Sequence, residues 1–202
     1  MIDRIFFFFC MCLCSVAIGQ SSFRKLSRPE KFWVVFHPLK AKKAKRITKE
    51  VQLCVDSVKQ SGIIGRDGNG GKLDAFKHTY WMSMLSQNIG KKQALKLGKA
   101  HEKGNYLQYK KRSLEDSILP DSVSSEMDLK NNEIGVNSIE RCHFKISPYE
   151  LKILVLEKLK DGQLYIIKKD PAGNYLDCQG AVINREAWLG KWNIPKCLIS
   201  SL

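Results

Sequence analysis

The sequence predicts a mainly α-helical protein, in which a multi-helix domain precedes one further helix and a small β-hairpin. Two observations favour this fold class. Several long segments between residues 38 and 160 repeat apolar residues at alternating spacings of three and four, the period of one helix face. A short strand-like run and a turn containing Pro and Gly follow over residues 164–178. Charged residues make up 27% and apolar residues 44%, which is typical of a globular protein.

The N-terminus has the pattern of a secretory signal peptide. A short charged segment precedes an apolar run over residues 5–18, and Ala17-x-Gly19 is a small-x-small cleavage site. The apolar run is shorter than the roughly 20 residues of a transmembrane helix, although an uncleaved N-terminal anchor is the alternative. We therefore predict a signal peptide over residues 1–19 and export to the periplasm or the medium.

The first predicted helix begins at Pro38, a residue favoured in the first helical turn, and ends near Gly62. Its apolar positions form one stripe, and a cluster of basic residues occupies the opposite face. We expect these basic residues to face solvent and to take no part in catalysis. The stripe consists of Ala44, Ile47, Val51, Cys54 and Val58, and the basic cluster consists of Lys40, Lys42, Lys43, Lys45, Arg46 and Lys49.

Three more helices are expected after a glycine-rich loop over residues 62–71. They span about residues 72–88, 91–103 and 121–133. With the first helix they make up a predicted domain over residues 28–138, which carries the candidate site. The stripe of the helix over 72–88 consists of Leu73, Phe76, Tyr80, Trp81, Met84 and Leu85.

The remaining residues, 139–202, are predicted to form a C-terminal extension. The segment Ser147-Pro148-Tyr149-Glu150 is a capping box with Pro at the first helical position, so a helix begins there. That helix is expected to end at Gly162. Residues 164–167 are predicted to form a strand, 170–174 a turn, and 175–178 the return strand of the hairpin.

The net charge of +14 predicts attraction to an anionic surface, either lipid head groups or an acidic polymer. The sequence contains no specific nucleic-acid motif, and no aromatic residues are interleaved with the basic cluster. It also lacks the glycine-rich phosphate-binding signatures G-x-x-x-x-G-K-[ST] and G-x-G-x-x-G, which argues against the common nucleotide-binding enzymes.

Four of the 7 cysteines remain once the signal peptide is removed. An even number of cysteines in an exported chain favours disulfides, and four cysteines allow three pairings. A bridge between Cys178 and Cys197 is the first choice, because it would hold the C-terminal tail in place. The four cysteines are Cys54, Cys142, Cys178 and Cys197.

Polar residues lie on or beside the apolar stripes of three of these helices. Asp74 and His78 are one helical turn apart and therefore share a helix face. Buried polar groups must satisfy one another or bind an ion or water, because an unpaired group costs about 1–3 kcal/mol. We therefore expect one pocket between the helices, roofed by Trp81. The residues expected to converge on it are Asp74, His78, His101, Glu102, Asp128 and Asn131.

Three separated blocks of sequence resemble a bacterial family of domains with no assigned function. The blocks are D-A-F-K-H-x-Y-W, then A-H-E, then M-D-L-K-N-N-x-x-G, within about residues 28–136. The chain departs from the family pattern at Lys77, Lys130 and Val136, and Lys130 argues against a mechanism that needs a third histidine. The resemblance implies no reaction, but it implies a site made of Asp74, His78, Trp81, His101, Glu102, Asp128, Asn131, Asn132 and Gly135.

Two functions from different classes remain open. The first is an exported hydrolase that uses a divalent metal, or a His–carboxylate pair alone, on an anionic envelope substrate. The second is a non-enzymatic secreted or envelope binding domain with a structural polar network. For the hydrolase, the metal ligands are His78, His101 and Asp128, and the substrate-binding residues are Lys77, Trp81 and Asn105. Its catalytic residues are Asp74, His78, His101, Glu102, Asp128, Asn131 and Asn132.

Overall fold

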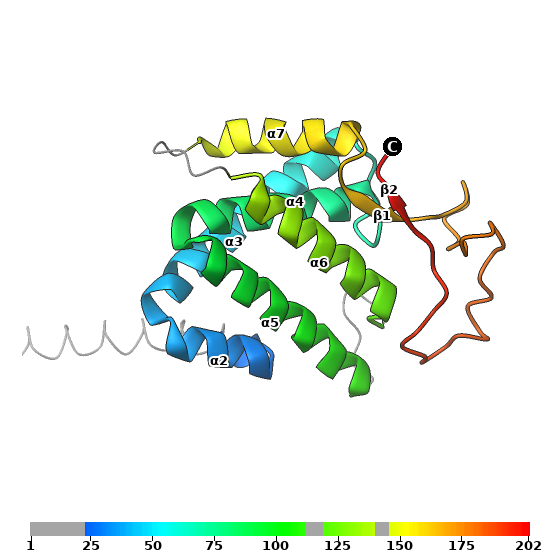
Figure 1. The fold of residues 1–202 in the computed structure, drawn as a ribbon, viewed down its shortest axis with the longest axis horizontal. Coiled ribbons are helices and arrows are strands. Elements are labelled where there is room, and N and C mark those ends of the chain that lie inside the picture. Colours follow the sequence, from blue (N-terminus) through cyan, green and yellow to red (C-terminus); the bar gives the residue numbers. More distant parts are fainter. Residues whose placement is uncertain (1–22, 112–118, 140–145) are drawn as a thin grey trace, which may run out of the picture.

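The structure, a computed structural model, describes residues 23–111, 119–139 and 146–202 (Figure 1). The predicted signal peptide lies outside these residues. Within them, no helix is long and apolar enough to cross a membrane. The prediction of a mainly α-helical protein with a small C-terminal hairpin is confirmed. The elements are α2 (Arg28–Phe36), α3 (Pro38–Ser61), α4 (Lys72–Ile89), α5 (Lys91–Lys110), α6 (Ser122–Asn137), α7 (Pro148–Lys160), β1 (Tyr165–Ile167) and β2 (Leu198–Ser200).

Helix α4 is the centre of the fold and packs against α3, α5, α6 and α7 (Figure 1). The predicted apolar stripe is only part of its buried surface, because neighbours surround it on several sides. Thr79, Ser83 and Ser86 are therefore buried as well, although the sequence pattern places them outside the stripe. A helix at the centre of a bundle buries polar residues that a helix at the surface would expose.

Helix α3 matches its prediction closely. It begins at Pro38 and ends before Gly62, whose φ of 70° is the left-handed conformation that glycine adopts most readily. The buried face contains Ile47 and Val51, and Val55 is more deeply buried than the predicted Cys54. The expectation of a solvent-facing basic cluster is confirmed for five of its members, while Lys40 is half-buried.

Helices α4 and α6 approach each other closely at Gly135. A Cβ atom at this position would lie 2.3 Å from the backbone oxygen of Thr79, so any side chain here would push the two helices apart. The hydroxyl of Ser83 lies 2.9 Å from the backbone oxygens of both Thr79 and Gly135. This contact fixes the spacing of the two helices that carry His78 and Asp128.

The C-terminal extension begins as predicted, because Ser147 and Glu150 form the capping box of α7. The partner of β1 differs from the expected one. Strand β1 pairs in antiparallel fashion with β2, whereas residues 175–178 contribute only isolated bridges, from Tyr175 to Lys169 and from Leu176 to Val182. The chain makes the expected turn but does not continue as a regular strand, and the tail returns to complete the sheet.

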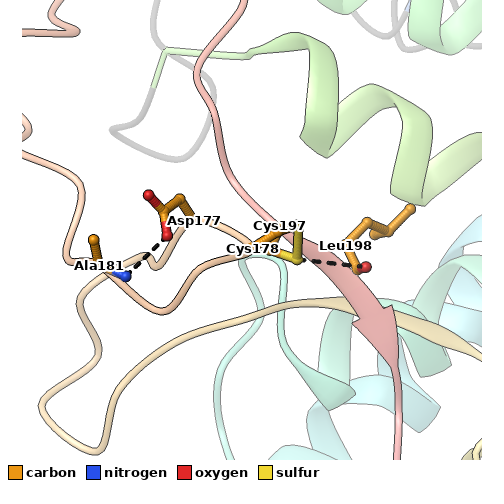
Figure 2. Close-up of a disulfide and its surroundings, with 5 residues drawn as sticks. All are labelled: Asp177, Cys178, Ala181, Cys197 and Leu198. Carbon is orange, nitrogen blue, oxygen red and sulfur yellow. Dashed lines mark hydrogen bonds between the residues drawn. A yellow bond between two sulfur atoms is a disulfide. The ribbon is translucent and has the colours of Figure 1, made fainter.

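The predicted disulfide between Cys178 and Cys197 is confirmed. It joins Cα atoms 4.8 Å apart and holds the tail directly before β2 (Figure 2). Cys54 is a free cysteine, and Cys142 lies outside the described residues.

Helix α2 was not expected from the sequence analysis. Ser27 caps it and forms a capping box with Glu30, with Pro29 in the first turn. The same residue types, Ser, Pro and Glu, mark the start of α7. A capping-box signal was therefore present before α2 as well. The apolar residues of α2 cover too few helical turns to show a helical period, so the sequence analysis did not predict this helix.

Candidate functional site

Three buried side chains from α4 and α6 form the centre of the candidate site. Asp74, His78 and Asp128 each offer one ligand atom, and these three atoms lie within 4.8 Å of one another. The Nε2 atom of His78 lies 3.3 Å from Oδ1 of Asp128 and 3.6 Å from Oδ1 of Asp74. The i,i+4 spacing on α4 brings the first two residues together, and the close contact of α4 with α6 adds the third.

Burial lowers the pKa of His78 to about 3, and the charges of Lys77 and His101 act in the same direction. The carboxylate of Asp74 and the hydrogen bond with Asn132 only partly oppose this effect. The imidazole is therefore neutral near pH 7. Its Nδ1 atom lies 3.3 Å from Oδ1 of Asn132. If Nδ1–H donates to that oxygen, Nε2 directs its lone pair at the two carboxylates.

Asp74 is held from two sides. The backbone N–H of Gly70 donates to its Oδ2 atom at 2.9 Å, which ties the glycine-rich loop to the first turn of α4. The ammonium of Lys77 donates to its Oδ1 atom at 3.3 Å. Lys77 therefore places one positive charge beside the two carboxylates, while its own side chain is still 38% exposed.

His101 lies beside this cluster but is not part of it. Its ring centroid is 6.5 Å from that of His78, so the two rings are close neighbours, as expected. Its Nδ1 atom faces Oε1 of Glu30 at 3.1 Å, and its ring packs against the edge of Trp81. Glu30 is a site residue that the sequence analysis missed, together with the helix that carries it. Burial raises the pKa of Glu30, but bonds with His101 and Ser27 outweigh this and lower it.

The polar groups face a small cleft of about 80 Å³ between α4, α5 and α6. A water molecule needs about 10–15 Å³ of such space, so the cleft has room for an ion with several waters or for the reacting group of a larger molecule. Asn69 from the loop before α4 and Ser124 from the first turn of α6 form further parts of its wall and were not predicted. The predicted site residues that line it are Asp74, Lys77, His78, His101, Asn105 and Asp128.

Four predicted residues do not line the cleft. Asn131 is fully buried, and its amide exchanges two hydrogen bonds with the backbone of Tyr165, so it holds β1 against α6. Glu102 is buried and accepts a bond from Asn105. Asn132 contacts the far nitrogen of His78, and Trp81 donates to Thr48. The expectation that all the polar residues converge on one pocket is therefore met only in part.

The donor atoms fit a divalent cation. Two ligands, each about 2.1 Å from a tetrahedral ion, lie roughly 3.4 Å apart, close to the separations measured around His78 Nε2. One imidazole and two carboxylates suit zinc, manganese or iron, and three protein ligands leave a coordination position for water or substrate. In this set Asp74 takes the place that the sequence analysis gave to His101.

Comparisons with known proteins agree with the sequence resemblance at the level of the domain. The sequence model of one family, a domain of unknown function termed DUF6973, matches residues 31–163. No curated protein and no solved structure matches the chain. The match covers more than half of the chain and includes Asp74, His78 and Asp128. The chain therefore belongs to the DUF6973 family, a family defined by a domain of unknown function.

Proposed function

We propose that this protein is an exported, metal-dependent hydrolase whose cation is held by Asp74, His78 and Asp128. The observation that carries the proposal is the buried cluster of a neutral imidazole and two carboxylates at the wall of a cleft. Two nearby carboxylates repel each other, and the ammonium of Lys77 pairs with Asp74. A divalent cation between the three donor atoms would relieve the repulsion between the two carboxylates.

The chemistry would be hydrolysis of an anionic substrate. When bound, a divalent cation lowers the pKa of a coordinated water and polarises a phosphoryl or carbonyl oxygen. His101 is positioned to exchange a proton at the cleft, since Glu30 holds its Nδ1 side and its ring lines the cleft. Lys77 and Asn105 line the same cleft and would orient an anionic group through charge and hydrogen bonds.

Export is supported by the disulfide between Cys178 and Cys197. Disulfides persist in oxidising compartments such as the periplasm and the extracellular medium. The expected signal peptide is consistent with this, and the intact mass of the exported protein tests it. A chain that begins at Gln20 would agree with cleavage after Gly19, and a retained N-terminus would contradict it.

Titration of the metal-free protein with Zn²⁺ and Mn²⁺ in a calorimeter tests the metal site. We expect one site per chain, and Asp128→Asn should weaken binding by about 100-fold or more because it removes a ligand. Asp56→Asn is a matched control, since Asp56 is an exposed carboxylate on α3 that bonds only Gln52 among the described residues. Equal affinities in the two variants would contradict the proposal.

Hydrolysis of bis-p-nitrophenyl phosphate tests the activity in the same proteins. We expect turnover that requires the added metal and is lost in Asp128→Asn but kept in Asp56→Asn. Nitrogen NMR of the imidazole in the metal-free protein provides a separate check. A proton on Nδ1 of His78 agrees with a metal ligand, whereas a proton on Nε2 would indicate a structural network in which His78 donates to Asp128.

A second candidate function is that of a non-enzymatic binding domain at an anionic membrane. Phe32, Val35 and Phe36 on α2 and Leu39 at the start of α3 are all more than 60% exposed. The basic cluster of α3 follows directly in the chain and faces solvent. Exposed apolar residues beside lysines are typical of helices that lie in the interface of an anionic bilayer.

Co-sedimentation with vesicles tests this second function. We expect the protein to bind vesicles that contain phosphatidylglycerol, and to bind pure phosphatidylcholine vesicles much more weakly, because the attraction depends on charge. Phe32→Ser combined with Phe36→Ser should reduce binding, while Leu53→Ser, at a side chain 71% exposed elsewhere on α3, should not. Binding that is the same in all three proteins would contradict a role for this surface.

A further inference from the structure

A second and larger cavity adjoins the candidate metal cleft. Its volume is about 450 Å³, within the range of about 300–1,000 Å³ that is usual for small-molecule sites. Residues 169–196 of the C-terminal extension form most of its wall and pack against the loops before α4 and α6. Asn69 and Leu119 line both the cavity and the cleft, so the two spaces share a border.

The lining of this cavity is rich in positive charge. Lys169 pairs with Asp67, and Lys196 pairs with Asp121 at 2.6 Å, so these charges balance in pairs. Two further cations, Arg185 and Lys191, also line the cavity and form no ion pair with a carboxylate among the described residues. The cavity therefore carries an excess of positive charge, which favours an anionic ligand.

Aromatic side chains make up another part of the wall. The ring of Tyr175 contacts two cations, with the ammonium of Lys169 at 4.6 Å and that of Lys196 at 3.7 Å from its centroid. The Tyr175 hydroxyl donates to the backbone oxygen of Asn69 at the shared border. Trp188 is half-buried, with Lys191 4.7 Å from its ring. Such rings offer an apolar surface for the uncharged part of a ligand.

The cavity is held in shape by the packing of the C-terminal extension. Besides the disulfide and the Lys196–Asp121 pair, the backbone N–H of Ser122 donates to the oxygen of Trp192. The Tyr109 hydroxyl donates to the oxygen of Gly190, and the rings of Tyr109 and Trp192 pack together. All of this extension beyond residue 163 lies outside the family match. Most of the cavity wall therefore comes from the part of the chain that the family match does not include.

We propose that residues 169–196 form a pocket that binds a phosphate or carboxylate group of the substrate through Arg185 and Lys191. The substrate would extend across the shared border, with its anionic group in this pocket and its reacting bond at the metal cleft. Anion binding by the pocket stands on its own, whereas the link to hydrolysis rests on the proposed function.

Calorimetry of the metal-free protein with inorganic pyrophosphate and with citrate tests the pocket. The two probes distinguish a phosphate site from a carboxylate site, and saturable binding of either one supports the inference. Arg185→Gln combined with Lys191→Gln should weaken binding by about tenfold or more, because it removes two charged hydrogen-bond donors. Lys96→Gln combined with Lys99→Gln removes the same charge from exposed positions on α5 and should leave the affinity nearly unchanged.

Equal weakening in the two double variants would show a general attraction to net charge and would overturn the pocket, as would the absence of saturable binding of both probes. The metal titration of the same proteins separates the two proposals. We expect Arg185→Gln with Lys191→Gln to keep its Zn²⁺ affinity, and Asp128→Asn to keep its pyrophosphate affinity. A wild-type protein that binds metal but neither anion refutes the pocket, and a wild-type protein that binds pyrophosphate but no metal refutes the proposed function.

Discussion

Two buried carboxylates of α6, Asp121 and Asp128, have very different surroundings. Asp121 caps the helix through the N–H groups of Val123 and Ser124, and the ammonium of Lys196 neutralises its charge. Asp128 lies further along the same helix. It faces the neutral imidazole of His78, and the carboxylate of Asp74 is close by. Both residues are at least 90% buried, so solvent does not account for the difference.

The comparison distinguishes a buried charge that stabilises the fold from buried charges that form a candidate binding site. A carboxylate with a full set of donors and a paired cation stabilises the fold at one place, here by holding the C-terminal extension to α6. In the cluster of Asp74, His78 and Asp128, two neighbouring carboxylates repel each other, which opposes folding. The proposed function gives this cluster a different role, which is to hold a cation.

The largest effect is expected from Lys196→Met, which breaks the buried ion pair with Asp121. It leaves the carboxylate of Asp121 buried without its cation, and removal of one partner of a buried pair costs about 3–5 kcal/mol. Chemical denaturation of the variant and the wild type measures the change. A loss below about 1 kcal/mol would mean that the pair holds little of the fold together.

A somewhat smaller loss is expected from Cys178→Ser combined with Cys197→Ser. The disulfide closes a loop with a sequence separation of 19, and a loop of this size contributes about 3 kcal/mol in the chain-entropy description. Thermal unfolding under oxidising conditions checks this. Reduction of the wild-type protein should give the same shift, and a shift in the reduced double variant would point to another cause.

Gly135→Ala tests the packing that joins the two helices of the metal cluster. The added methyl group meets the backbone oxygen of Thr79, which cannot move without the helix, so we expect a loss of about 1–3 kcal/mol. Zn²⁺ affinity should fall as well, because His78 and Asp128 move apart. Ala172→Gly is the control, because it changes one methyl group without a clash. Gly173→Ala in the same turn is not suitable, because Gly173 has a positive φ.

The smallest effect is expected from Asp128→Asn in the metal-free protein. Neutralising one of two neighbouring carboxylates relieves repulsion, so the free energy of unfolding should rise or change by less than about 1 kcal/mol. With saturating Zn²⁺ the wild type should gain stability, about 2.7 kcal/mol at a metal concentration 100 times the Kd, and the variant should not. A large loss in the metal-free variant would show that the cluster stabilises the fold.

Sequence periodicity predicted the buried face of a helix best where the surroundings of the helix are simple. Helix α3 has solvent on one side and a core on the other, so Pro38, Gly62 and its apolar stripe defined it well. Helix α4 is surrounded by other helices, and its buried Thr79 and Ser83 follow no period. Helix α2 is too short to show a helical period.

The candidate site, like the helices, was predicted only in part. The spacing of Asp74 and His78 on one helix predicted their contact, because residues four apart share a face. The grouping of these two with Asp128, rather than His101, depended on the close approach of α4 and α6 at Gly135. The contact of His101 with Glu30 depended on a helix that was not predicted.

By itself the sequence determined the helical class, the boundaries of most helices and the polar residues worth examining. Each of these depends on neighbours in the chain or on residue type alone. Tertiary structure decided that β1 pairs with β2, that Asn131 holds the backbone of β1, and that residues 169–196 enclose a cationic cavity. These features arise where distant segments meet, and their geometry depends on how helices pack rather than on any local pattern.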